Sequence, residues 1–220
     1  MPISETYNID VMEYLNGVED GAFDLAICDP PYGIGEDGGS FRGRNGQGHR
    51  VLEKKDWDKS RPEKRFFDEI FRVSQNQIVW GGNYFTDYLF PSRGWIFWDK
   101  LMGGDFSDGE LAWASFDRVL RKFTMCNKMH GKTHPTEKPV ELYLYQLANY
   151  ARPGDKIFDP MMGSQSSRIA AWDMGFDYVG CEKDEDYFRD GEARFKKHVA
   201  NKTTLFAPEQ MYNFEQTKLF

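Results

Sequence analysis

The sequence is poor in cysteine, short of positive charge and free of long hydrophobic runs. Its three cysteines, Cys28, Cys126 and Cys181, are scattered and odd in number, which argues against a disulfide framework. No apolar stretch is long enough to span a bilayer, and the opening MPISETYNID lacks the basic segment of a secretory signal. We therefore expect a cytoplasmic protein with no membrane partner.

The formal net charge of −7 argues against a nucleic-acid partner when the chain is taken as a whole. The distribution of charge can outweigh its total, however, and two local clusters are basic. They comprise Arg42, Arg44, His49, Arg50, Lys54 and Lys55, and then Arg118, Arg121, Lys122, Lys128 and Lys132.

Hydrophobic residues make up 40% of the 220 residues, which is enough for the core of one α/β domain. Short apolar runs alternate with helical patterns, which predicts a mostly parallel twisted sheet with helices on both faces. Strands are expected at 6–10, 23–29, 76–82, 94–100, 110–116, 155–160 and 177–182, and helices at 11–18, 61–74, 139–151, 166–175 and 184–198. Residues 1–200 are predicted to form one domain, with a mobile loop at 35–56 and a flexible tail at 201–220.

Three of the predicted strands end in an acid, namely Asp29, Asp159 and Glu182. Ligands of open α/β sheets bind outside the carboxyl ends of the strands, so each acid marks a candidate site. Asp58, in contrast, is expected to be a solvated surface residue.

The segment after Asp159 has the features of a nucleoside-binding site. Gly163 lies in a turn before a predicted helix, and the free N–H groups of a helix N-terminus suit a small anion. Glu182 follows about twenty residues later, where an acid can bind both hydroxyls of a ribose. The dinucleotide fingerprint G-x-G-x-x-G is absent, so S-adenosylmethionine (SAM), which has no phosphate, fits better than a dinucleotide. An ordinary strand–turn–helix with capping acids is the alternative.

The motif DPPY, Asp29 to Tyr32, gives the end of the strand at 23–29 a different chemistry. Pro30 and Pro31 stiffen the backbone and remove N–H donors, so their carbonyls point in fixed directions. A carboxylate, a carbonyl and the flat ring of Tyr32 would form a pocket for a planar ring that carries an amino group. A proline-rich strand end with an exposed tyrosine is the alternative.

Taken together, DPPYGIG, HPTEKPVELY, DPMMGSQSSRIAA and VGCEKDEDYF resemble the amino-group DNA methyltransferases. The order of these motifs, with the catalytic half before the SAM half, is similar to the β-class of that family. The resemblance extends from about Tyr7 to Phe195 and implies a Rossmann-like, circularly permuted SAM-dependent fold. In this family DPPY usually accompanies adenine-N6 methylation and SPPY cytosine-N4 methylation. The resemblance therefore implies a site-specific adenine-N6 enzyme of a bacterium or phage-infected cell, of the restriction–modification kind.

The resemblance also implies roles for individual residues. Asp29 and Pro30, with Pro31 beside them, would hold the amino group of a base flipped out of double-stranded DNA, and Tyr32 would stack on that base. The implied SAM-binding residues are Asp10, Asp29, His134, Thr136, Lys138, Asp159, Pro160, Gly163, Ser164, Ser166 and Glu182. The implied DNA-binding residues are Arg42, Arg44, Arg50 and Lys54 in the mobile loop, and Arg118, Arg121 and Lys122 in a short target-recognition segment at 116–132.

One departure from the family pattern leaves alternatives open. The family commonly has Gly-Ser-Gly where this chain has Gly163, Ser164 and Gln165, and a side chain at Gln165 would crowd the cofactor or disfavour a positive φ. A catalytically inactive DNA- or nucleotide-binding protein is therefore one alternative reading. Cytosine-N4 methylation and RNA methylation are the others.

Further expectations concern metals and partners. Cys126, His130 and His134 lack a clear fourth ligand, so no metal site is predicted. The small recognition segment leaves room for a homodimer that shares the DNA contacts. In the tail, Gln216, Leu219 and Phe220 match the pattern Q-x-x-L-F, which resembles bacterial sliding-clamp-binding peptides.

Overall fold

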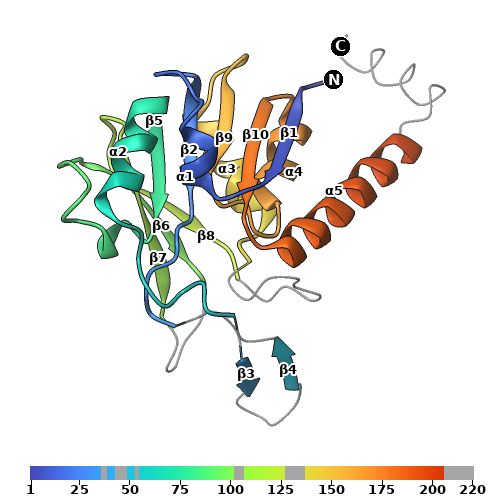
Figure 1. Ribbon diagram of the computed structural model, residues 1–220, viewed down its shortest axis with the longest axis horizontal. Coiled ribbons are helices and arrows are strands. Elements are labelled where there is room, and N and C mark those ends of the chain that lie inside the picture. Colours follow the sequence, from blue (N-terminus) through green and yellow to red (C-terminus); the bar gives the residue numbers. More distant parts are fainter. Residues whose placement is uncertain (36–38, 43–48, 53–54, 102–106, 127–136, 206–220) are drawn as a thin grey trace, which may run out of the picture.

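The computed structural model describes residues 1–35, 39–42, 49–52, 55–101, 107–126 and 137–205 (Figure 1). Its helices are α1 (Val11–Leu15), α2 (Lys64–Val73), α3 (Val140–Tyr150), α4 (Ser166–Met174) and α5 (Glu185–Leu205). Its strands are β1 (Ser4–Asn8), β2 (Phe23–Cys28), β3 (Gly39–Arg42), β4 (His49–Leu52), β5 (Ser74–Trp80), β6 (Gly94–Asp99), β7 (Gly109–Ala114), β8 (Arg121–Thr124), β9 (Lys156–Asp159) and β10 (Asp177–Glu182).

Eight strands form one sheet in the order β1-β10-β9-β2-β5-β7-β6-β8. All neighbours in this sheet pair in parallel except β7, which runs antiparallel to both β5 and β6. The predicted mostly parallel sheet is therefore confirmed. Because β2 lies directly beside β9, with Leu25 opposite Ile157, the predicted catalytic and cofactor halves of the sequence meet at the centre of the sheet.

The segments expected to be irregular contain more structure than the sequence indicated. Strands β3 and β4 pair as an antiparallel ribbon within the predicted loop 35–56, and the ribbon projects beyond the edge at which the parallel strands end (Figure 1). Strand β8 lies inside the predicted recognition segment. Helix α5 continues to Leu205, so the predicted tail begins within a helix. Among the described residues, no helix is long and apolar enough to cross a membrane.

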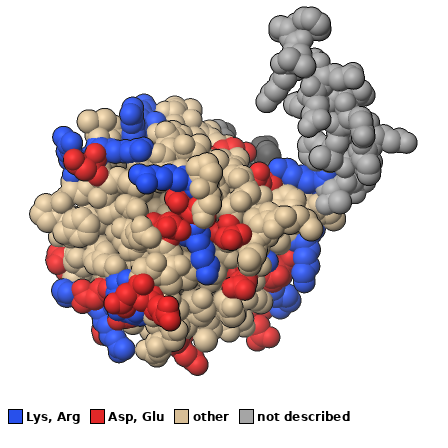
Figure 2. Space-filling model, turned by 90° about the horizontal axis from the view of Figure 1, so that it is seen from above, with Lys and Arg blue, Asp and Glu red and all other residues tan. Residues whose placement is uncertain are grey.

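Acidic and basic side chains are mixed on the side of the molecule opposite the ribbon. Figure 2 views this side, which is the top of Figure 1, and shows Lys and Arg interspersed with Asp and Glu. The ribbon and the strand ends lie on the other side of the molecule.

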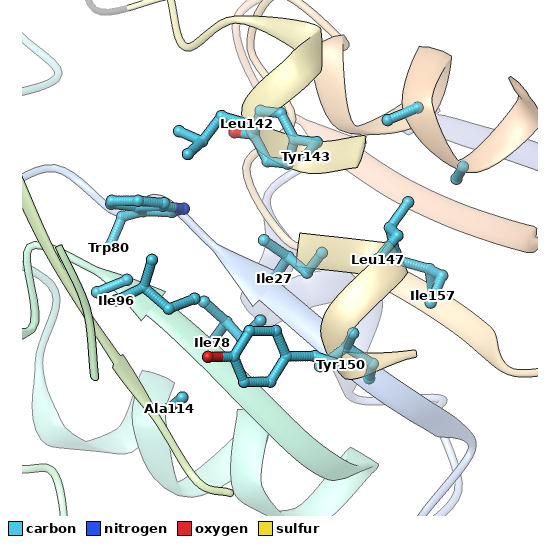
Figure 3. Close-up of a cluster of buried hydrophobic side chains, with 14 of the residues drawn as sticks. Ile27, Ile78, Trp80, Ile96, Ala114, Leu142, Tyr143, Leu147, Tyr150 and Ile157 are labelled. Atoms are coloured by element: carbon cyan, nitrogen blue, oxygen red, sulfur yellow. The ribbon is translucent and has the colours of Figure 1, made fainter. Parts of the chain in front are cut away.

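The alternation of side chains along β2 divides the core into two layers, one on each face of the sheet. Leu25 and Ile27 join the cluster that α3 and α4 cover, part of which is drawn in Figure 3. Ala26 and Cys28 point to the opposite face, where they join the cluster covered by α1 and α2. Burial on both faces explains why β2 is apolar along almost its whole length.

Candidate functional site

A cavity of about 720 Å³ opens where β1, β2, β9 and β10 end. Asp29 and Pro31 reach it from the end of β2, and Gly163 reaches it from the loop after β9. Glu182 lines it at the end of β10, and Asp10 lines it at the start of α1. The structure thus brings the two halves of the predicted site into one cavity. The predicted site residues that line it are Asp10, Asp29, Pro31, Lys138, Pro160, Gly163, Ser164 and Glu182, whereas Pro30, Tyr32, Asp159 and Ser166 do not.

The carboxylate of Asp29 is fixed by two neighbours. The Tyr32 hydroxyl donates a hydrogen bond to Asp29 Oδ1 over 2.9 Å. The ammonium Nζ of Lys138 lies 2.5 Å from the same oxygen, and only 3% of the Lys138 side chain is exposed. Both of these contacts, made by described residues, fall on Oδ1, which leaves Oδ2 for a ligand.

A second carboxylate, Glu110, faces the same ammonium group. Its Oε2 lies 3.1 Å from Lys138 Nζ, and Lys100 pairs with its Oε1. Burial raises the pKa of Asp29, although Lys138 limits the rise. Burial acts in the same direction on Glu110, but Lys138 and Lys100 outweigh it and hold the pKa of Glu110 at about 2. The pKa of Lys138 is raised, because its two carboxylate partners outweigh the effect of burial.

The ring of Tyr32 is packed on a second aromatic residue. It stacks on Tyr84 with ring centroids 4.9 Å apart and an interplanar angle of 14°. Gly81, which has a φ of +65°, lies against the ring, and Phe85 meets it edge-on. The residues after β5 therefore hold the Tyr32 ring in place beside Asp29.

The loop between β9 and α4 is held by Glu182. Its Oε2 accepts a hydrogen bond from the Gly163 N–H (2.9 Å), and its Oε1 accepts one from the Asp184 N–H (2.9 Å). An ionised carboxylate has about four lone-pair sites, so Glu182 retains acceptor capacity for a hydroxyl group of a ligand. Burial raises the pKa of Glu182, and its backbone hydrogen bonds oppose that rise.

Asp159 is turned away from the cavity into the protein. Its carboxylate accepts hydrogen bonds from the Met161 N–H (3.0 Å) and the Ser167 hydroxyl (2.5 Å). Burial raises the pKa of Asp159 to about 7, even though both hydrogen bonds act against the rise. This carboxylate shapes the loop that carries Gly163.

Gln165 is compatible with the loop, although the sequence suggested a conflict. Its backbone adopts the positive φ of +60° that glycine would supply more easily, and its side chain is fully buried. The amide donates to Glu192 (3.3 Å) and accepts from Arg168 (2.8 Å), so it points toward α5 and not into the cavity. Gly191 leaves the space that this side chain occupies.

Comparison with known proteins identifies the family. The DNA methylase family of N6 and N4 methyltransferases matches residues 53–193, more than half of the chain. The chain belongs to this family. The Type II methyltransferase M2.MboI of Moraxella bovis is 22% identical over 245 residues, covering 86% of this chain and 86% of that protein. The Type II methyltransferase M2.LlaDCHI of Lactococcus lactis subsp. cremoris is 22% identical over 151 residues, covering 69% of this chain and 53% of that protein.

Solved structures confirm the methyltransferase fold of this methylase. The complex of M1.HpyAVI with SAM has a TM-score of 0.58 at 17% identity, covering 87% of this chain and 98% of that one. The protein TTHA0409 of Thermus thermophilus, complexed with SAM, has a TM-score of 0.61 at 16% identity, and the match covers 90% of this chain and 95% of that one. The cytosine-N4-specific PvuII DNA methyltransferase has a TM-score of 0.61 at 14% identity, and the match covers 90% of this chain and 92% of that one.

The cofactor of this methylase family is SAM, and the cavity has the chemistry to hold it. Glu182, which lines the cavity, could accept hydrogen bonds from ribose hydroxyls. Ile9 and Met161 supply apolar surface for a purine, and the carboxylate of Asp29 lies on the same lining. The residues present therefore fit the cofactor.

A short segment after β4 ties the two halves of the methylase site together. Asp58 is not solvated as the sequence suggested, because only 2% of it is exposed and its Oδ1 accepts from the Gly33 N–H (2.8 Å). Lys55 binds both carboxylate oxygens of Asp184, each over 2.6 Å, and lies over the ring of Tyr187. Sequence patterns gave no signal for these contacts, since the partners of Lys55 are more than a hundred residues away.

Arg194 on α5 braces the loop between β9 and α4, a role that the sequence did not reveal. Its guanidinium donates to the Ser164 carbonyl (2.6 Å) and to the Ser166 hydroxyl (2.9 Å). It also lies 3.1 Å from Glu137, the residue before Lys138. The buried Ser166 therefore supports the loop instead of lining the cavity.

The predicted DNA-binding residues lie in separate places. Arg42 and Arg50 are on the β3–β4 ribbon. Arg118 donates to the Asn149 carbonyl at the end of α3, while Lys122 on β8 pairs with Asp99. Arg121 begins β8. Arg44, Lys54, His134, Thr136 and the predicted clamp-binding residues Gln216, Leu219 and Phe220 lie outside the described residues.

Proposed function

We propose that this DNA methylase transfers the methyl group of SAM to the N6 amino group of an adenine flipped out of double-stranded DNA. One observation carries the proposal: the Asp29 carboxylate lines the same cavity as Gly163 and Glu182. The choice of adenine rests on the DPPY motif, Asp29 to Tyr32. A modification role of the Type II kind follows from the names of the relatives.

The chain's own residues would prepare the amino group. A free Asp29 oxygen and the Pro30 carbonyl accept hydrogen bonds from its two protons, which makes its lone pair more available than in an isolated base. Tyr32, fixed by Gly81 and Tyr84, provides the stacking surface, and such stacking offsets the few kcal/mol that extruding a base costs. When bound, SAM supplies a methyl group activated by a positively charged sulfur. The Asp29 carboxylate, which would accept a hydrogen bond from the amino group, would also take up the proton that the nitrogen loses on methylation.

The other residues would hold the cofactor and the DNA. Glu182 would bind the ribose hydroxyls, and Asp10 would lie near the adenine of SAM. The backbone N–H groups that follow Gly163 at the start of α4 suit the carboxylate of SAM. The β3–β4 ribbon, which carries Arg42 and Arg50, would contact phosphates on the side from which the base enters.

Cytosine-N4 methylation is the second candidate, because the PvuII methyltransferase, which is cytosine-N4-specific, shares the fold. The same acceptors would serve the amino group of either base. The orientation of the Gln165 side chain toward α5 favours an active enzyme over an inactive binding protein.

Transfer of tritiated methyl groups from SAM to DNA, followed by nucleoside analysis of the product, tests the proposal. We expect N6-methyladenine from the wild-type protein, and from Asp29→Ala no transfer but unchanged SAM binding. N4-methylcytosine would refute the choice of adenine, and a wild-type protein that binds SAM without methylating any nucleic acid would refute the proposed activity.

A further inference from the structure

Lys138 is directed at the catalytic motif, although its position in HPTEKP suggested a role in binding SAM. Its ammonium group lies 2.5 Å from Asp29 Oδ1 and 3.1 Å from Glu110 Oε2. It also donates to the Tyr32 hydroxyl over 3.3 Å. Three protein oxygens therefore surround a cation whose side chain is 3% exposed.

The ammonium group belongs to a row of alternating charges that converges from four parts of the chain. Lys100 follows β6, Glu110 is the second residue of β7, Lys138 precedes α3 and Asp29 follows β2. Lys100 pairs with one oxygen of Glu110, and Lys138 lies between the other oxygen and Asp29. Because β7 runs against its neighbours, its first residues lie at the edge where the parallel strands end, and this places Glu110 in the row.

The other described groups whose charges are coupled to Asp29 do not supply a positive charge. Besides Lys138, Glu110 on β7 and Tyr32 act on Asp29. Asp29 in turn acts on Tyr143 on α3, Asp159 on β9 and Cys28 on β2. Among these six groups the positive charge is that of Lys138. A buried carboxylate without a cation takes up a proton, and a protonated carboxyl group has lost part of its capacity to accept hydrogen bonds.

We propose that Lys138 is a positioning residue that keeps Asp29 ionised and engages its Oδ1, so that Oδ2 is left to accept a hydrogen bond from the target amino group. Glu110 holds the ammonium group from the opposite side, and Lys100 balances the charge of Glu110. This inference rests on the proposed function, because it assigns Lys138 to the chemistry of the base and not to SAM.

Lys138→Met, which keeps most of the stem but removes the charge, tests the inference. The titration of Asp29 is followed by carboxyl carbon NMR of the free protein, with Asp29→Asn to assign the signal, and the pH dependence of kcat is measured alongside. We expect both the titration and the acid limb of kcat to move about 1–3 pH units upward, the effect of one nearby opposite charge. KM for SAM should stay within about threefold of the wild-type value, because the inference places Lys138 against Asp29 and not against the cofactor.

Two controls separate charge from fold. Lys138→Arg retains the charge and should restore the titration of Asp29 toward the wild-type value. Lys64→Met makes the same substitution on the exposed face of α2, where the side chain is 63% exposed, and should change neither readout.

The inference is overturned if Lys138→Met titrates like wild type and only KM for SAM rises, since Lys138 would then be a cofactor contact. Should Lys138→Met fail to fold, Glu110→Gln decides: removing this negative charge should move the titration of Asp29 downward, and an unmoved titration overturns the inference. If the wild-type protein transfers no methyl group, the proposed function fails, but the NMR titration still tests the contact between Lys138 and Asp29.

Discussion

Gly81→Ala is expected to damage both the stability and the activity of the protein, because a β-carbon at this position would lie 2.2 Å from Cε1 of Tyr32. The backbone φ of +65° adds a second cost, about 1–2 kcal/mol for any residue other than glycine. Displacing a packed side chain costs typically about 1–3 kcal/mol more. The free energy of unfolding should therefore fall by roughly 2–5 kcal/mol in total.

Gly21→Ala is the matched control for backbone strain. Gly21 has a φ of +66°, but a β-carbon there would have no atom within 4 Å. Urea denaturation should show a loss of about 1–2 kcal/mol for this variant, and methyl transfer should keep its wild-type kcat. Gly81→Ala should lower kcat at least about tenfold, because the ring that it displaces holds Asp29 through its hydroxyl and is the surface on which the base would stack.

A double-mutant cycle isolates the collision from the strain. In a Tyr32→Ala background the ring is gone, so Gly81→Ala should cost only about 1–2 kcal/mol, as Gly21→Ala does. If Gly81→Ala costs the same with and without the Tyr32 ring, or if it matches Gly21→Ala in both stability and kcat, the packing of Tyr32 against Gly81 is refuted.

Two further predictions concern the cofactor side of the cavity. Because burial raises the pKa of Asp159 to about 7, the folded protein holds a proton that the unfolded chain loses near pH 4, so this residue makes stability fall as pH rises from about 4 to about 7. Asp159→Asn should flatten that part of the curve of unfolding free energy against pH, and a variant curve parallel to the wild-type curve would contradict the assignment. Glu182→Gln should weaken SAM binding at least about tenfold in calorimetry, since an amide cannot accept as many hydrogen bonds from Gly163 and a ribose as a carboxylate can. The same substitution at the exposed Glu141 on α3 should leave binding unchanged, and equal affinities for the two variants would exclude Glu182 from the cofactor site.

The fold was predictable because local patterns carry most of its information. The apolar run of β2 and the amphipathic pattern of α2 follow from burial on one or two faces, and the alternation of strands and helices leads to a mostly parallel sheet. Strand β8 was missed because it is short and largely polar, and it is stabilised by pairing with β6 and not by its own composition.

The candidate site was predictable where its residues stand at the ends of strands. Asp29 and Glu182 were found in this way, and they line one cavity. Asp159 was found by the same reasoning, but its side chain is turned into the protein, because the direction of a side chain in a turn is set by packing. Asp58 was misjudged for a similar reason, since its burial comes from a contact with Gly33 across 25 positions in the sequence.

The sequence by itself determined the chemistry available to this protein: a proline-stiffened acid beside a tyrosine, and a strand–turn–helix with an acid at the end of the next strand. Only the tertiary structure decided which of these groups meet and how they are charged. Lys138 became the shared partner of Asp29 and Glu110 because one antiparallel strand and one loop bring these groups to the same edge of the sheet. The physical reason is that burial and pairing set the charge of an ionisable group, and both depend on residues that are distant in the sequence.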